Sequence, residues 1–173
     1  RVESIVIVQI DEEMKPIEGT EKEIPCDTVL FAVGLIPENE IAKHSGISFD
    51  SITKGPVVNE NMESSIPGIF AAGNVVQVYD LVDYVTMAGE TAGEHAARFV
   101  RGEKGENRFR VKPGENVRSV VPQWVTCEND VDIRFRVTKP IDKADILVNN
   151  IKSKTVIGVR PSEMVSLRLT KDD

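Results

Sequence analysis

The 173-residue sequence contains only two cysteines, Cys26 and Cys127, and they lie far apart without a C-x-x-C spacing. This arrangement excludes a local dithiol redox pair and gives no cysteine pattern for a zinc site. No apolar run approaches the roughly 20 residues that a helix needs to span a bilayer. We therefore expect a protein that does not enter the membrane, that resides in the cytoplasm and whose thiols are buried or idle.

Positive charge is also scarce. The sequence has 21 lysines and arginines against 28 aspartates and glutamates, and its formal net charge is −7. Proteins that bind the phosphate backbone carry clustered positive charge, so we expect no nucleic-acid partner. The chain is 40% hydrophobic and 28% charged, which is typical of a globular protein and argues against disorder.

The motif G-x-G-x-x-G, whose backbone cradles the phosphates of a dinucleotide, does not occur in the sequence. The first residue is Arg1 rather than methionine, and Val2–Ile10 already has the composition of a strand. We therefore expect the chain to be a segment of a longer protein, with any phosphate-binding turn upstream of Arg1. The two histidines, His44 and His95, lie beside charged residues on predicted helices, and we assign them no catalytic or metal-binding role.

Residues 1–37 have the pattern of an extended region. Val2–Ile10 is rich in Val and Ile, and the polar stretch Asp11–Glu23 contains Pro and Gly, so these residues predict a β-hairpin. Asp27–Gly34 is a nearly unbroken apolar run, which is typical of a strand buried on both faces.

Residues 38–102 combine helical and extended patterns. Glu38–Ser45 predicts a short helix, and Ile69–Gly73 predicts a second short buried strand. The apolar and small residues of Tyr84–Arg101 recur at helical spacing, and Gly102 follows as a stop signal. Asp80 and Asp83 flank the start of this helix, where we expect a carboxylate to cap it or to complement its dipole.

The character of the sequence changes after the charged, glycine-bearing stretch Gly102–Arg110, which suggests a boundary between domains. Short extended runs follow, and Val131–Val137 alternates strictly between apolar and charged residues. We predict a small antiparallel β-sandwich or partial barrel. Arg134 and Arg136 should share one outward face, either as a solvated row or as a docking face. The runs are Val117–Val125, Val131–Val137, Ala144–Val148, Thr155–Val159 and Glu163–Leu169.

Two motifs occur in a fixed order. Asp27–Pro37 reads D-x-V-x-x-A-x-G-x-x-P, and about thirty residues later Ser65–Val75 reads S-x-P-G-I-F-A-A-G-N-V, followed by the alanine-containing helix. A strand that ends in glycine lets a ligand approach the backbone, and a nearby helix N-terminus offers unpaired N–H groups. The order of these motifs in residues 1–106 resembles the C-terminal half of flavoproteins with two dinucleotide-binding domains, such as thioredoxin reductases, NADH oxidases and disulfide reductases.

This resemblance implies a fold and a domain division. The fold would be an α/β fragment of a Rossmann-like dinucleotide-binding flavoprotein domain, followed by the small β-sandwich-like domain. Residues 1–37 would hold the end of the nicotinamide-binding domain and, at Gly34 and Pro37, the crossover to the flavin domain. Residues 38–106 would be the C-terminal segment of the FAD-binding domain, and residues 107–173 a small all-β domain.

The resemblance also implies the residues that bind FAD. Asn74 would bond a ribityl hydroxyl, the backbone at Gly73 and Val75 would lie near the cofactor, and N–H groups of the following helix would face the flavin ring. The family usually has aspartate where this sequence has Asn74, whose amide oxygen can still accept a hydrogen bond but brings no charge. The helix residues are Asp83, Tyr84, Val85 and Thr86.

The function implied for the parent protein is transfer of hydride from NADH or NADPH through FAD to an acceptor. No side chain of this chain is predicted to act as acid, base, nucleophile or metal ligand, so we expect the isolated piece to be inactive. The alternative is a non-catalytic binding or assembly module with a β-sandwich interaction domain. A segment without its neighbouring strands should expose sheet edges and apolar faces, and we therefore expect self-association or a partner subunit.

Overall fold

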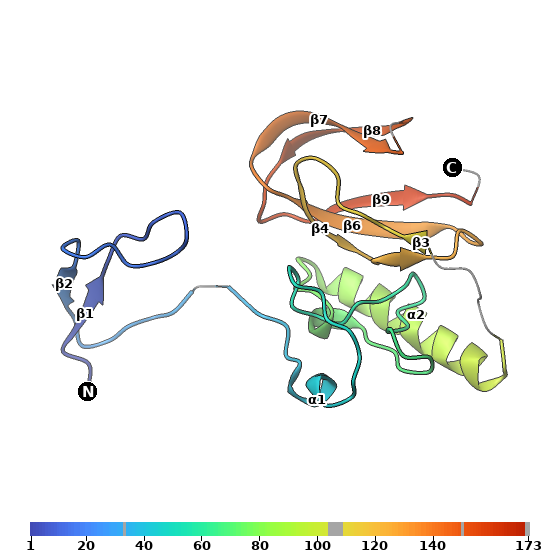
Figure 1. The fold of residues 1–173 in the computed structure, drawn as a ribbon, viewed down its shortest axis with the longest axis horizontal. Helices are drawn as coiled ribbons and strands as arrows, with labels where there is room; N and C mark the ends of the chain where they lie inside the picture. The colour runs from blue at the N-terminus through green and yellow to red at the C-terminus, as the bar shows by residue number, and fades with distance from the viewer. Residues whose placement is uncertain (33, 104–108, 150, 172–173) are drawn as a thin grey trace. The chain divides into compact units, whose positions relative to one another are not determined.

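A computed structural model describes residues 1–32, 34–103, 109–149 and 151–171 (Figure 1). The chain divides into two compact units, Arg1–Gly34 and Leu35–Asp173. The boundary predicted between residues 106 and 107 lies outside the described residues. The three-part division therefore stays a prediction.

The first unit contains the predicted β-hairpin. Strands β1 (Ser4–Ile7) and β2 (Lys22–Pro25) pair in antiparallel fashion, with Ser4 opposite Pro25 and Ile7 opposite Lys22. The turn between them is stabilised by Asp11, whose carboxylate accepts hydrogen bonds from two backbone N–H groups further along the turn. The hairpin prediction is thus confirmed.

The buried strand predicted for Asp27–Gly34 is wrong. Residues 27–32 and 34 form no strand, and the side chains of Leu30 and Phe31 are 90% and 84% exposed; Val33 lies outside the described residues. A strand buried on both faces needs hydrogen-bonded neighbours and a layer of structure on each side. No strand in the described parts of the chain pairs with this run, so its apolar composition alone does not order it.

The second unit begins with α1 (Glu40–Lys43), a short helix inside the range predicted for one. The main helix, α2 (Val82–Val100), confirms the prediction of a helix over Tyr84–Arg101, starting two residues earlier and ending one residue earlier. Gly102 follows it with φ of 86°, a left-handed conformation that suits glycine at a helix end.

The strand predicted over Ile69–Gly73 is also wrong. Ser64 N donates to Ile69 O at 2.8 Å and Ala71 N donates to Met62 O at 2.9 Å, so the segment folds back on itself in a tight local turn. These bonds occupy backbone groups that a strand in a larger sheet would offer to a neighbour. The chain then forms η1 (Gly73–Val75), a single turn of 3₁₀ helix.

The C-terminal region is β-rich and antiparallel, as predicted. Strand β6 lies at the centre of a three-stranded sheet of order β4-β6-β9, while β3 pairs with β5 and β7 pairs with β8. The sheets share a core of Val, Ile, Phe and Leu side chains centred on Ile133 and Phe135. The strands are β3 (Phe109–Arg110), β4 (Val117–Val121), β5 (Trp124–Val125), β6 (Val131–Val137), β7 (Ile141–Val148), β8 (Ile151–Val159) and β9 (Val165–Leu169).

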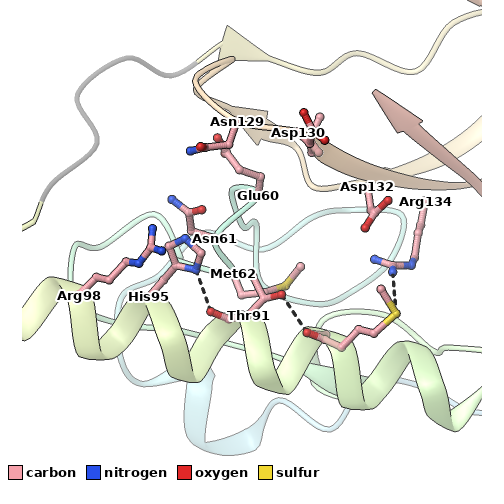
Figure 2. A pocket seen from close by; sticks show the side chains of 13 residues that line it. Glu60, Asn61, Met62, Thr91, His95, Arg98, Asn129, Asp130, Asp132 and Arg134 are labelled. Atoms are coloured by element: carbon pink, nitrogen blue, oxygen red, sulfur yellow. Dashed lines mark hydrogen bonds between the residues drawn. The ribbon is translucent and has the colours of Figure 1, made fainter. Parts of the chain in front are cut away.

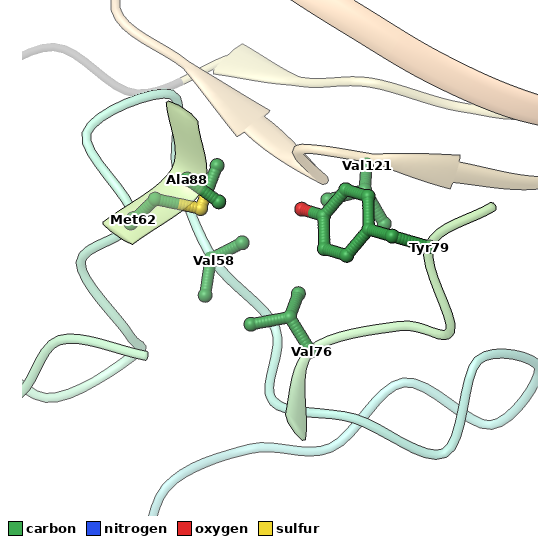
Figure 3. Packing of buried hydrophobic residues seen from close by; sticks show 6 residues of the cluster. All are labelled: Val58, Met62, Val76, Tyr79, Ala88 and Val121. Atoms are coloured by element: carbon green, nitrogen blue, oxygen red, sulfur yellow. The ribbon is translucent and has the colours of Figure 1, made fainter. Parts of the chain in front are cut away.

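A second core joins this β-rich region, which we call the β-region (residues 109–171), to the α2 region. Its buried members come from the segment around Val58, from the segment between η1 and α2, from α2 and, through Val121, from β4 (Figure 3). The contact is also polar, since Gln123 N donates to Val58 O and Gln123 Oε1 accepts from Val58 N, both at 3.0 Å. The β-region therefore packs directly on the segment that precedes it.

Candidate cofactor-binding site

The seven residues predicted to bind a cofactor lie in two neighbouring segments, η1 and the first turns of α2. Gly73 is buried with φ of 72°, and a Cβ at this position would lie 3.3 Å from the Val85 side chain. The structure therefore brings the glycine turn against the start of the helix. A left-handed φ and a close neighbour both favour glycine at this position.

Asn74 is exposed at the surface of η1. Its Oδ1 accepts a hydrogen bond from the backbone N–H of Tyr79 at 3.1 Å, which closes the loop that follows η1. An amide oxygen has two lone pairs and the amide nitrogen two donors. The side chain can therefore hold the loop and still hydrogen-bond a ligand hydroxyl.

The N-terminus of α2 carries no side-chain cap. Leu81 occupies the N-cap position and makes no capping hydrogen bond, so the prediction of capping by Asp80 or Asp83 is wrong, whereas Asp83 lies in the first turn, where its charge complements the helix dipole. Both carboxylate oxygens of Asp80 are engaged elsewhere, with Arg136 and with Met164 N. Tyr84 N donates to Leu81 O at 3.2 Å, which leaves the N–H groups of Val82 and Asp83 at the N-terminus of α2, the position at which helices bind electronegative ligand atoms.

The remaining predicted residues lie in the first two turns of α2. Tyr84 and Val85 are half-buried and pack against the core around Val58. Thr86 is exposed, and its hydroxyl donates to Val82 O at 3.2 Å within the helix. The resemblance predicts backbone contacts with the flavin from this turn, and these contacts stay a prediction.

The sequence did not predict that Arg134 and Arg136 contact the first turn of α2 and the segment before it. The alternation correctly placed them on one face of β6, but this face is not solvated: Arg134 is 5% exposed and lies over the Tyr84 ring at 4.9 Å from its centroid. Arg136 donates to Val78 O at 3.0 Å and pairs with Asp80. The face that we predicted as either a solvated row or a docking face therefore docks on this chain's own α2 region.

A cavity of about 280 Å³ lies between α2 and the β-region (Figure 2). His95 and Arg98 enter it from α2, whereas Asp132 and Arg134 enter it from β6. None of the seven predicted cofactor residues lines it. His95, to which the sequence assigned no role, is half-buried, with Nδ1 2.9 Å from Thr91 O.

The described parts of the chain show neither a metal site nor a membrane-spanning helix. No group of three or more His, Cys, Asp or Glu side chains there is arranged to hold a metal ion. No helix among those residues has both the length and the apolarity to cross a membrane. Cys26 is half-buried and Cys127 exposed, and both are free thiols.

Comparison with known proteins agrees with the resemblance. A thioredoxin reductase from Listeria monocytogenes is 37% identical over 87 residues, which are 49% of this chain and 26% of that protein. The putidaredoxin reductase CamA of Pseudomonas putida is 39% identical over 61 residues, 33% of this chain and 14% of that protein. The nitric oxide reductase FlRd-NAD(+) reductase of Klebsiella pneumoniae is 36% identical over 62 residues, which are 36% of this chain and 16% of that protein.

This chain thus spans about a quarter or less of the length of these relatives. No solved structure matches it. The family described as pyridine nucleotide-disulphide oxidoreductase matches residues 2–92, more than half of the chain, including the hairpin, η1 and the first part of α2. The chain therefore belongs to the pyridine nucleotide-disulphide oxidoreductase family.

Proposed function

We propose that this chain supplies part of the FAD-binding site of an NAD(P)H-dependent oxidoreductase. The observation that carries the proposal is the contact between the Gly73–Val75 turn and the uncapped start of α2 inside the region that matches the family. The exposed amide of Asn74 suits a ribityl hydroxyl, and the N–H groups of Val82 and Asp83 at the α2 N-terminus suit an electron-rich part of the flavin.

The bound cofactors would supply the redox chemistry, with hydride passing from NADH or NADPH to FAD and then to an acceptor. The residues of this chain would bind and orient FAD and exclude water, and none is assigned a catalytic role. Because the chain spans a quarter or less of its relatives and contains no G-x-G-x-x-G motif, we propose that it completes no catalytic cycle alone. A non-catalytic assembly module is less well supported, since the relatives compared above are named as reductases.

Replacing Asn74 by leucine is expected to weaken FAD binding about tenfold, because one hydrogen bond to a ligand is worth roughly 1–1.5 kcal/mol. Asn74→Asp keeps an acceptor oxygen and should bind FAD nearly as well as the wild type. The measurement is a flavin fluorescence titration, with retention of the visible flavin bands after desalting as a second readout. Asn129→Leu, at an exposed asparagine of the β-region, is the control. Equal affinities for Asn74→Leu and the wild type, or no FAD binding by the wild type, would contradict the proposal.

We also propose that the β-region is a small sandwich. The supporting observation is that Val159 of β8 is buried in the same core as Ile133 of β6 and Leu167 of β9. In the proposed arrangement the β7-β8 pair covers one face of the three-stranded sheet. Two antiparallel sheets that bury facing side chains have this arrangement.

Self-association is proposed as well, because apolar side chains that a strand would bury are exposed. Leu30 and Phe31 are the most exposed of them in the first unit. We expect the protein to sediment as a dimer or larger species at micromolar concentration, and Leu30→Glu with Phe31→Glu should shift it toward the monomer. Analytical ultracentrifugation measures this directly. A wild-type protein that is already a monomer would show the proposal to be wrong.

A further inference from the structure

The segment between η1 and α2 is held from outside by the β-region. Arg136 of β6 donates from Nη2 to Val78 O at 3.0 Å and pairs with one carboxylate oxygen of Asp80. The other carboxylate oxygen of Asp80 accepts a hydrogen bond from Met164 N, just before β9. Two separate parts of the β-region, strand β6 and the residue before β9, therefore bind the residues that precede α2.

The ion pair is partly shielded from water. The side chains of Arg136 and Asp80 are 19% and 30% exposed, whereas the other ion pairs described join side chains that are mostly more open to solvent. Arg136 also donates from Nη1 to Ser162 O at 2.5 Å, so one guanidinium links β6, the turn before β9 and the segment before α2. A planar guanidinium with five donors can make such a junction, and the ammonium group of lysine cannot reproduce it.

A second contact reaches the helix itself. The guanidinium of Arg134 lies over the ring of Tyr84, the third residue of α2, at 4.9 Å from the ring centroid. Arg134 is buried, and this geometry falls within the range of attractive cation–π contacts. Arg134 and Arg136 project from the same face of β6, so one strand fixes both the approach to α2 and its first turn.

These contacts also determine what Asp80 does. An aspartate immediately before the N-cap residue lies near the positive end of the helix dipole. Here both of its oxygens are occupied by the β-region, and α2 has no side-chain capping bond. Loss of Arg136 would loosen the segment and free one carboxylate oxygen near the N–H groups that the cofactor needs.

We propose that Arg136 and Asp80 are positioning residues through which the β-region fixes the first turn of α2 and thereby sets the affinity for FAD. The inference rests on the proposed function for its cofactor. Its structural part, that the β-region restrains the start of α2, can be measured without any cofactor.

The test compares Arg136→Met with Arg118→Met, a matched control at an exposed arginine on neighbouring strand β4. Amide hydrogen exchange at residues 81–86, measured without FAD, should be about tenfold faster in Arg136→Met and unchanged in Arg118→Met. FAD affinity should fall by about the same factor. Asp80→Ala should also speed this exchange and weaken FAD binding. The double variant should lose less than the product of the two single effects, because both substitutions remove the Arg136–Asp80 pair while each also removes a separate backbone contact.

Emission from Trp124, the single tryptophan, reports whether the β-region of each variant stays folded. If Arg136→Met does not fold, Asp80→Ala carries the comparison. Unchanged exchange at residues 81–86, or faster exchange with unchanged FAD affinity, would overturn the inference. If the wild type binds no FAD, the proposed function fails, and the exchange comparison alone then supports or overturns the restraint on α2.

Discussion

Gly55→Ala is expected to destabilise the protein by roughly 3 kcal/mol, at the upper end of the usual range for overpacking a core. A Cβ at position 55 would lie 1.8 Å from Val76 O, 2.4 Å from Val76 C and 2.7 Å from Val75 O. All three are backbone atoms, which cannot rotate away as a flexible side chain can. The methyl group therefore has to push Val75 and Val76 out of place.

The clash affects both the core and the proposed cofactor site. Val76 is fully buried in the core shared with the β-region, and Val75 ends the η1 turn that carries Asn74. We expect the midpoint of urea-induced unfolding to fall sharply and any FAD binding to fall with it. If Gly55→Ala is as stable as the wild type, the backbone of Val75 and Val76 does not lie against position 55, and the prediction is wrong.

Gly93→Ala is the matched control. Gly93 is exposed within α2, and a Cβ there would meet nothing within 4 Å. Alanine is favoured over glycine in a helix interior by roughly 0.5–1 kcal/mol, so this variant should unfold at a higher urea concentration than the wild type. The same substitution is thus expected to act in opposite directions at two sites of one chain.

Removing the β-region is expected to abolish cooperative unfolding of what remains. A chain that ends at Gly102 loses Val121 from the core and loses Gln123, which satisfies both the N–H and the C=O of Val58. It also loses Thr126, whose backbone N–H donates to Glu60 at 2.7 Å. Buried polar groups left without partners and a half-open core both destabilise a fold strongly.

Thermal unfolding followed by circular dichroism measures this effect. The wild-type chain should give a sigmoidal transition, and the chain ending at Gly102 a broad, shallow one. A chain that begins at Leu35, the boundary between the two compact units, is the control and should keep a sharp transition near the wild-type midpoint. A sharp transition in the chain ending at Gly102 would show that residues 38–102 fold without the β-region.

The elements that the sequence predicted correctly are those with a local cause. The 3.6-residue spacing of Tyr84–Arg101 and the strict alternation of Val131–Val137 match α2 and β6 closely, because these periods determine which face of each element is buried. The predicted strands over Asp27–Gly34 and Ile69–Gly73 were wrong because strand formation depends on a partner, and an apolar run does not specify one.

In the candidate site, too, some features could be predicted from the sequence and others could not. The order of motifs, read as a family resemblance, selected Gly73–Val75 and Asp83–Thr86, and the structure places these two segments against each other. The contact between Arg136 and Asp80 joins residues 56 positions apart. No periodicity or turn signal links positions so distant, and only the tertiary structure shows that β6 docks beside the start of α2.

The hydrogen bonds between Val58 and Gln123 also bear on how the protein is synthesised. Domains generally fold from the N-terminus as they leave the ribosome, but this core lacks one wall until the chain has been made past Gln123. During that interval the apolar side chains around Val58 and Val76 have no cover from β4. The core around Val58 can therefore close only after translation has passed Gln123, well beyond the family-matched segment.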